Sequence, residues 1–223
     1  MDQSDFNGAL SELERFLTEP KNAEFFPLAL RTKGELLLLC NRVEEAEDFY
    51  QAIINVQNFT WAQLGLVRCY LQLNKDDEAE RLILRLAFQP DAMLSAYDLL
   101  TALQIKQQEF DDALESVNIA AHISPSNVGR HRQAVDLSKI TRDYPAQFDA
   151  AKRVVRYAKH SFHDKPENYL NVARAGIDFA MTADASETAK LVKQTHDFIR
   201  QMKEAFPKAA VDNELKVIDE RIY

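Results

Sequence analysis

Glycine, cysteine and long apolar runs are scarce in this sequence, and each shortage excludes a class of protein. The five glycines among 223 residues are dispersed, so they cannot form the glycine-rich loop that cradles phosphates in nucleotide-binding proteins. The longest aliphatic run, Leu36 to Leu39, is far too short to cross a bilayer. The N-terminal stretch MDQSDFNGALSEL is acidic and has no continuous apolar core, unlike a signal peptide. We therefore expect a cytoplasmic protein with no membrane partner.

Only two cysteines occur, Cys40 and Cys69, and each lies inside an apolar run. One interpretation is a redox pair or a metal site. The simpler interpretation, which we favour, is that both thiols are buried and pack as small apolar side chains. Since no further cysteine supports a zinc site, the sequence predicts no metal and no cofactor.

Positive charge is also in deficit, because 27 basic residues face 35 acidic ones and the net charge is −8. An acidic chain has no overall attraction for phosphate backbones or anionic lipids, so we expect no nucleic-acid partner. Leucine, alanine, glutamate and lysine are plentiful, which favours helix over strand.

Three short stretches read almost alike: VEEAEDFY, DDEAERLI and FDDALESV. Their alanines, Ala46, Ala79 and Ala113, are 33 and 34 residues apart, which is the period of a helix–turn–helix repeat. The pattern extends to Ala9 in DFNGAL and to Ala151 in QFDAAK, with spacings of 37 and 38 residues. The sequence therefore predicts a chain of repeated helix pairs.

Each repeat has two stretches with apolar residues at helical spacing, and the prolines fall between them. Asp76, Asp111 and Asp149 would lie at or near the starts of second helices, where a carboxylate caps free N–H groups. The marker alanine would let neighbouring helices approach closely, and Gly34 and Gly65 would do the same on the first helices. The side chains four residues after the marker would fill the next layer: Tyr50, Ile83 and Val117.

The period, the marker alanine and the closing prolines together resemble the tetratricopeptide repeat (TPR). The resemblance implies an all-α fold: a TPR-like right-handed α-solenoid of antiparallel helix pairs. We expect one continuous domain, in which a partial repeat or cap helix (1–24) precedes TPR-like repeats (25–160) and irregular capping helices (161–223). A last, weaker copy would centre on Ala189. Because Ala9 marks a second helix without a first, either residues 5–18 form a lone cap or, as we favour, the chain is a piece of a longer protein.

The sequence contains no convincing catalytic constellation. His160 and His163 in HSFHD could share a helix face and bind a metal, but further ligands are missing, so a solvated helix end is the better interpretation. The one compact basic cluster, GRHRQ at 129–133, could contact phosphate or an acidic partner, although we favour a solvated helix start. The sequence predicts that the protein is not an enzyme. A site hidden in the C-terminal third is the less favoured alternative.

In stacked helix pairs the first helices line the concave side. Counting back from the marker alanines places charges of both signs and apolar patches there, which suits a protein or peptide ligand. Trp61 is either a groove anchor or, as we favour, ordinary packing between repeats. The register of the fourth repeat is ambiguous, with Arg132 and Asp136 as its candidates. The candidate partner-binding residues are Arg31, Glu35, Trp61, Leu64, Arg68, Asp98, Arg132 and Asp136.

A narrower resemblance lies in NFTWAQLGLVRCYLQLNKDDEAERLI, ISPSNVGRHRQAVDLSKITRDYPAQFDAAKRVVRYAKHS and ENYLNVAR. These stretches are similar to the TPR half of bacterial response regulators, in which a receiver domain precedes the repeats. The resemblance implies a non-catalytic output domain of two-component signalling, whose partner is a protein such as a sensor histidine kinase. It also implies a receiver domain upstream, although no receiver signature is visible in this sequence. The alternative is a TPR adaptor for secretion, envelope assembly or chaperoning, and the oligomeric state stays open.

Overall fold

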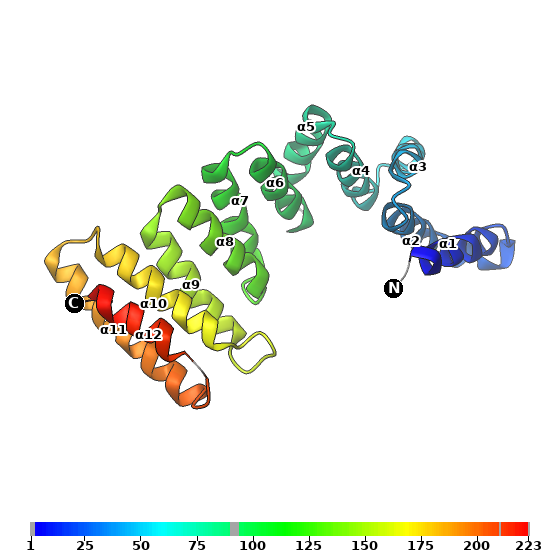
Figure 1. The fold of residues 1–223 in the computed structure, drawn as a ribbon. Coiled ribbons are helices and arrows are strands. Elements are labelled where there is room, and N and C mark those ends of the chain that lie inside the picture. The colour runs from blue at the N-terminus through cyan, green and yellow to red at the C-terminus, as the bar shows by residue number, and fades with distance from the viewer. Residues whose placement is uncertain (1–2, 90–93, 210, 223) are drawn as a thin grey trace. The chain divides into compact units, whose positions relative to one another are not determined.

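The computed structural model describes residues 3–89, 94–209 and 211–222. Over these residues the fold is all-α, with twelve α-helices, one 3₁₀ helix (η1, Pro20–Phe25) and no strand (Figure 1). The α-helices are α1 (Gln3–Leu17), α2 (Phe26–Leu39), α3 (Val43–Val56), α4 (Thr60–Gln72), α5 (Asp76–Ala87), α6 (Leu94–Lys106), α7 (Phe110–Ile123), α8 (Val128–Thr141), α9 (Tyr144–Ala158), α10 (Pro166–Ala180), α11 (Ala185–Ala205) and α12 (Asp212–Ile222). Neighbours in sequence pack as adjacent pairs. The expected all-α fold of solenoid type, built from helix pairs, is confirmed.

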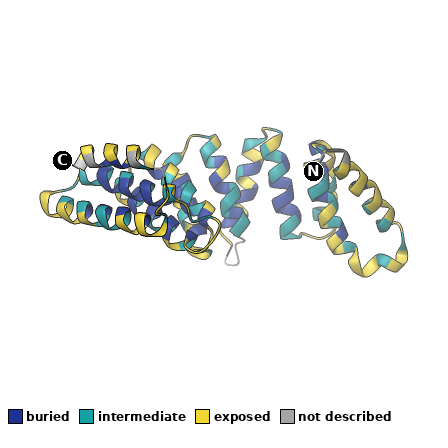
Figure 2. Cartoon of the chain, turned by 60° about the horizontal axis from the view of Figure 1, so that its bottom comes forward, coloured by how far each residue is buried: buried dark blue, intermediate teal, exposed yellow. Residues whose placement is uncertain are grey.

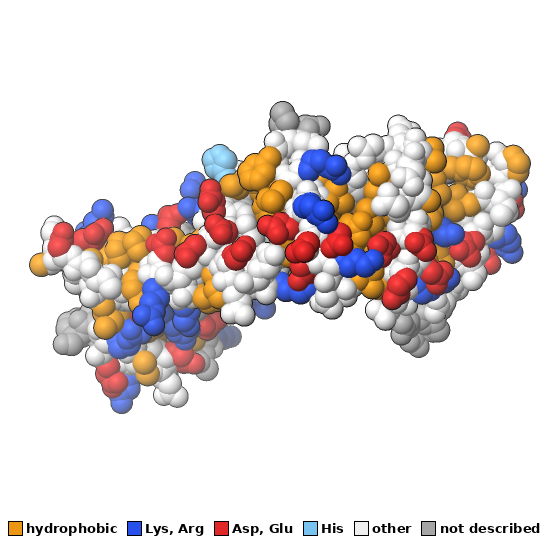
Figure 3. Space-filling view, turned by 90° about the horizontal axis from the view of Figure 1, so that it is seen from above, with side chains coloured by type: hydrophobic (Ala, Val, Ile, Leu, Met, Phe, Trp, Pro, Cys, Tyr) orange, Lys and Arg blue, Asp and Glu red, His pale blue; other side chains and the backbone are white. Residues whose placement is uncertain are grey.

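The chain divides into two compact units, Met1–Leu103 (unit 1) and Gln104–Tyr223 (unit 2). Unit 1 has 17 acidic and 9 basic residues, whereas unit 2 has 18 of each, so the whole net charge of −8 belongs to unit 1. On the face drawn in Figure 3, acidic side chains are numerous and lie among basic and hydrophobic ones. The expected domain boundaries at residues 24 and 160 stay predictions.

The helix pairs from α2–α3 to α8–α9 all turn through one backbone motif. Asn41, Asn74, Gln108 and Arg142 have left-handed backbone, with φ between 57° and 63°. These residues recur at intervals of 33, 34 and 34 residues. In every turn the following amide donates to the carbonyl five residues before it, at 2.8–2.9 Å, which is the Schellman arrangement that closes a helix. The period predicted from the alanines is therefore repeated in the backbone.

The marker alanines lie where the sequence predicts within both units. Ala46, Ala79 and Ala113 are 0% exposed and Ala151 is 1% exposed, so each permits a close helix contact that a larger side chain would prevent. The next layer is filled as expected, because Tyr50, Ile83 and Val117 are also buried. In Figure 2 the buried residues lie on the helix sides that face a neighbour, and the exposed residues lie on the opposite sides.

The predicted inward position is wrong for two marker alanines, Ala9 and the weaker copy at Ala189. Ala9 is exposed, and the buried residue of α1 is Leu10, which is 1% exposed. Because α1 packs on α2, the apolar partner decides which side faces inward, and the alanine lies one position out of phase. Ala189 on α11 is exposed as well, and Leu191 and Thr195 are buried instead.

The predicted position at a helix start is also wrong for one of the three aspartates. Asp76 and Asp111 do lie in first turns, of α5 and α7. Asp149 lies in the middle of α9, where it pairs with Arg153. Asp143 begins α9 instead, since its carboxylate accepts a 3.0 Å hydrogen bond from the Ala146 amide.

Candidate functional site

A pocket of about 270 Å³ lies between α8, α9 and α10 in unit 2. Its floor is apolar, because the α9 side chains that reach it are an alanine and a valine, both buried. Its walls on α8 and α10 are mostly polar or charged. We call it the α8–α10 groove. It is lined by Arg132, Val135 and Asp136 of α8, Ala151 and Val154 of α9, and Lys165, Glu167, Asn168 and Asn171 at and after the start of α10.

The local sequence explains how the second wall forms. Lys165 has extended backbone, and Pro166, whose fixed φ suits a first helical position, begins α10. Asn168 and Asn171 then follow one turn apart on the same side of the helix. Asn168 therefore meets Arg132 of α8 across the groove, and Asn171 and Asp136 also line it.

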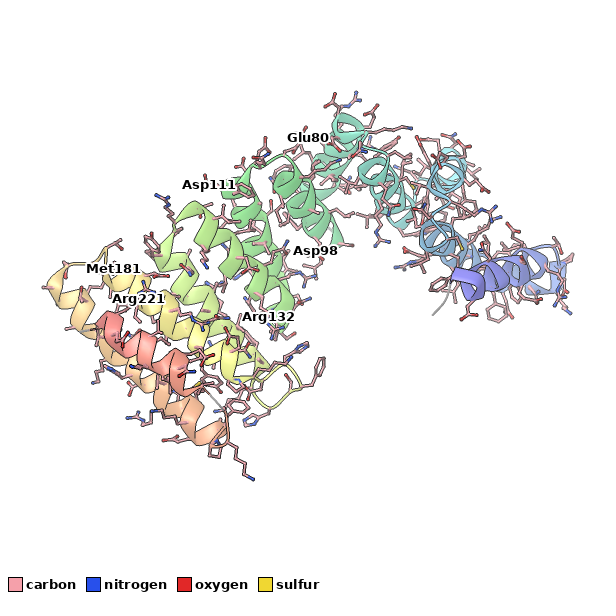
Figure 4. All side chains as sticks on the ribbon, viewed as in Figure 1. Glu80, Asp98, Asp111, Arg132, Met181 and Arg221 are labelled. Carbon is pink, nitrogen blue, oxygen red and sulfur yellow. The ribbon has the colours of Figure 1, made fainter. Side chains whose placement is uncertain are left out.

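Arg132 is held across the groove by neutral acceptors. Its Nη2 donates to the carbonyl oxygen of His163 and to Oδ1 of Asn168, both at 3.3 Å. Asn168 Nδ2 donates to the same carbonyl at 2.8 Å. The guanidinium, labelled in Figure 4, is thus positioned without a carboxylate partner among the described residues. Glu167, by contrast, pairs with Arg174 at 2.5 Å.

In unit 1 the predicted residues lie on α2, α4 and α6. Glu35 of α2 and Arg68 of α4 form an ion pair, in which Nη1 donates to both carboxylate oxygens at 2.7 Å. Arg31 is exposed, and Asp98 is half-buried on α6 (Figure 4). The structure therefore joins two of the candidates to each other.

Two apolar candidates of unit 1 belong to the packing between helices. Leu64 is 5% exposed and lies in the core, so its proposed place on a partner-facing surface is wrong: the side chain fills the space between helices. Trp61 is half-buried and stacks on Phe59, with ring centroids 5.7 Å apart. It also meets the edge of Tyr50 at 6.3 Å, which is the packing role favoured from the sequence.

The sequence predicted half of the groove. Arg132 and Asp136, chosen by counting from the repeat, do lie together on one wall. Lys165, Asn168 and Asn171 were missed, because the regular repeats were expected to end at residue 160. The signal that could have found them is the stretch KPEN, in which a lysine and a proline begin a helix and an asparagine follows. Their role in binding stays a prediction, as does that of the other candidates.

The remaining candidate groups of the sequence, the basic cluster, the histidines and the cysteines, form no common site among the described residues. The basic cluster GRHRQ separates in space, because His131 is 1% exposed and stacks on Tyr157 while Arg132 enters the groove. Among the described residues, no group of three or more His, Cys, Asp and Glu side chains could hold a metal ion. Both cysteines are buried and reduced. No helix in the described part of the chain is long and apolar enough to span a membrane.

Comparison with known proteins yields matches among solved structures alone. No protein-family profile and no curated protein matches the sequence. A crystal structure of MamA matches with a TM-score of 0.58 at 12% identity, over 85% of this chain and 96% of its own. MamA of AMB-1 matches with a TM-score of 0.55 at 16% identity, over 86% and 98%. YrrB, a TPR protein described as having an unusual peptide-binding site, matches with 0.53 at 14% identity, over 86% and 99%.

The chain has a TPR-like fold. In TPR terms α8 and α10 are the first helices of adjacent repeats, and α9 is the second helix of the earlier one. The α8–α10 groove is therefore a space between two first helices, closed from below by the second helix between them. The Glu35–Arg68 pair likewise joins first helices of adjacent repeats, 33 residues apart.

Proposed function

We propose that this chain is a non-catalytic scaffold that binds a segment of a partner protein in the α8–α10 groove. The observation that carries the proposal is the lining of that groove, which combines an apolar floor with charges of both signs and two amides. A peptide segment offers the matching chemistry: apolar side chains for the floor and main-chain N–H and C=O groups for the amides. The description of YrrB as a TPR protein with a peptide-binding site supports the proposal.

The amide of Asn171 is the group best suited to read a peptide backbone. Its Oδ1 accepts from Arg174 Nη1 at 3.0 Å, and that bond fixes the side chain in the groove wall. Among the described residues no acceptor pairs with its Nδ2, and Asn171 lines the groove, so its two N–H donors are available to a ligand there. A main-chain carbonyl of a bound segment would satisfy them.

Selection of a random peptide library on the full chain tests the proposal. Peptides that are enriched on the chain are then titrated by calorimetry against Asn171→Arg, which places a long side chain in the groove. The matched control is Gln201→Arg at an exposed position of α11. We expect Asn171→Arg to abolish binding and Gln201→Arg to leave it unchanged. Equal affinity of all three proteins for the selected peptides would refute the groove as the binding site.

A finer proposal rests on sequence resemblance alone. We propose that the partner is a signalling protein such as a sensor histidine kinase, and that the chain is the output domain of a bacterial response regulator acting in the cytoplasm. Affinity capture from a bacterial lysate, with Asn171→Arg as the control bait, tests it. Recovery of a histidine kinase by the unaltered chain alone supports signalling. Recovery of a translocon component or a chaperone instead would favour the adaptor role in secretion, envelope assembly or chaperoning.

A further inference from the structure

Within the described part of the chain, the two cations of the α8–α10 groove make no ion pair, whereas Arg68, an equivalent cation in unit 1, does. Arg68 is neutralised by Glu35 of the adjacent first helix, with both bonds at 2.7 Å. Arg132 also reaches across to the adjacent first helix, 36 residues away, but it meets the amide of Asn168 at 3.3 Å. A neutral amide oxygen attracts a guanidinium less strongly than a carboxylate does. Among the described residues, therefore, Arg132 keeps a positive charge that no carboxylate offsets at ion-pair distance, although the carboxylates of Asp136 and Glu167 also line the groove.

A second cation and a helix terminus add to that charge. Lys165 lines the same groove at the start of α10. Among the described residues no carboxylate oxygen lies within ion-pair distance of its Nζ, and the same holds for the guanidinium of Arg132. The N-terminus of α10 carries the positive end of the helix dipole at this point. Three sources of positive potential therefore lie at the start of α10, where Arg132 reaches His163 and Asn168. Of the two carboxylates that line the same groove, Glu167 is paired with Arg174, and Asp136 lies one helical turn beyond Arg132 on α8.

The remaining lining decides what kind of anion fits. Val135, Ala151 and Val154 make an apolar floor beside the cations, where the methylene groups of a side chain could lie. Arg132 lies on α8 and Lys165 at the start of α10, so an anion that contacts both must reach into the space between the two helices. An acidic side chain meets both demands, because it has an apolar stem and a carboxylate at its end.

We propose that the α8–α10 groove is an acceptor site for an acidic side chain, glutamate or aspartate, of the bound partner segment, with the carboxylate between Arg132 and Lys165. The proposal rests on the proposed function, because it requires that a partner segment occupies this groove. It deepens that function by naming the residue type that the groove selects. Arg132 is already oriented by His163 and Asn168, so little side-chain entropy is lost when the carboxylate binds.

Three pools of immobilised peptides test the proposal with the full chain as analyte. The first has a central glutamate flanked on each side by four randomised uncharged residues, with both ends blocked. The second replaces the glutamate with glutamine. The third has the glutamine and a free C-terminal carboxylate. We expect the glutamate pool to bind about tenfold more tightly than the glutamine pool, since hydrogen bonds to charged groups are the stronger ones.

Variants assign that preference to the two cations. Lys165→Ala removes a side chain that makes no hydrogen bond or ion pair within the described part of the chain, so the fold should be unaffected. We expect most of the glutamate preference to disappear. Arg132→Ala should remove it as well, whereas the matched control Arg68→Ala should leave it intact. Melting curves of the three variants check that each is folded.

The relative binding of the three peptide pools distinguishes the acidic side-chain site from the proposed peptide-binding function. Equal binding of the glutamate and glutamine pools would overturn the acidic side-chain site and leave the proposed peptide-binding function standing. Equal binding of the glutamate pool and the free C-terminus pool would overturn it too, because the carboxylate would then come from a chain end. Failure of all three pools to bind would contradict both the site and the proposed function.

Discussion

Tyr50 on α3 occupies the space that a side chain on Gly65 of α4 would need. A Cβ atom added to Gly65 would overlap the tyrosine ring, and one added to Gly34 of α2 would come within 2.5 Å of Tyr50 Cζ. The ring is 1% exposed, and burial raises the pKa of its hydroxyl group. A single aromatic ring is thus seated against bare backbone on the first helices of two adjacent repeats.

Gly65→Ala is therefore expected to destabilise the protein. The new methyl group would push Tyr50 or α4 aside, and overpacking of this kind costs ~1–3 kcal/mol. The better helix propensity of alanine, worth ~1 kcal/mol, offsets only part of that cost. The free energy of unfolding from urea titration measures the difference.

Gly8→Ala is the matched control, since no atom of the described residues lies within 4 Å of a Cβ added to Gly8 in α1. This substitution should stabilise the protein by about 0.5–1 kcal/mol through helix propensity alone. The double variant Tyr50→Leu, Gly65→Ala should lose less stability than the two single variants added together, because the smaller side chain frees the space. Strictly additive losses would show that the ring and the glycine are not in conflict.

The left-handed turn residues lead to a second prediction. Gln108 has φ of 63°, and this conformation costs ~1 kcal/mol or more for most residues but less for asparagine, which tolerates it. Gln108→Asn should therefore raise the free energy of unfolding by about 0.5–1 kcal/mol. The same change at Gln201, an exposed residue inside α11, should lower it slightly, because asparagine is the poorer helix former. If both substitutions shift the melting temperature in the same direction, the backbone explanation is wrong.

The helix pairs could be predicted from the sequence, whereas the left-handed turns between them could not. Alanine spacing predicts the helix pairs, since a small residue is needed wherever two helices cross closely. The left-handed turns share the same period, but their residues are Asn, Asn, Gln and Arg, so no common letter marks them. The prediction that Ala9 is buried is wrong for a related reason. The contact with α2 determines which side of α1 faces inward, and a local sequence motif contains no information about that contact.

His131 gives a third prediction, which concerns pH. The ring is buried, and Nε2 lies 2.7 Å from the carbonyl oxygen of Pro125, while Nδ1 has no hydrogen-bond partner among the described residues. Burial lowers the pKa of His131, although the Pro125 carbonyl partly opposes this. Below the ordinary histidine pKa of about 6.5, the unfolded chain binds a proton at this histidine and the folded chain does not. The free energy of unfolding therefore falls as the pH falls.

We expect His131→Gln to weaken that pH dependence, because glutamine does not titrate. The urea midpoint of the unaltered protein should fall more steeply than that of the variant between about pH 7 and pH 5, the range in which an ordinary histidine takes up its proton. The slopes are compared rather than the absolute midpoints, since glutamine also changes the packing against Tyr157. His122→Gln, at an exposed position of α7, serves as the control. Identical slopes for His131→Gln and the unaltered protein would contradict the assignment.

The groove was only half predictable for a structural reason. Arg132 and Asp136 follow from the repeat register, because α8 continues the pattern of earlier first helices. Lys165 and Asn168 depend on where α10 begins, and that point is set by the turn at His163, whose carbonyl oxygen accepts from both Arg132 and Asn168. A pattern of apolar residues carries no information about such a polar turn.

The last prediction concerns Cys69 and tests whether its thiol is inert and buried or chemically reactive. The side chain is 0% exposed in the core of unit 1, and burial raises its pKa to about 12. The thiolate is the reactive form, so at about pH 8 alkylation in the folded protein should be slower than in the unfolded chain by roughly three orders of magnitude. Iodoacetamide labelling of Cys40→Ser, followed by mass spectrometry with and without urea, measures this ratio. Fast labelling of the folded protein, or a disulfide between Cys40 and Cys69 after mild oxidation of the unaltered chain, would restore the redox interpretation.

The raised pKa of Cys69 also predicts that the free energy of unfolding falls above about pH 8.5, because the unfolded chain releases a proton there that the folded chain retains.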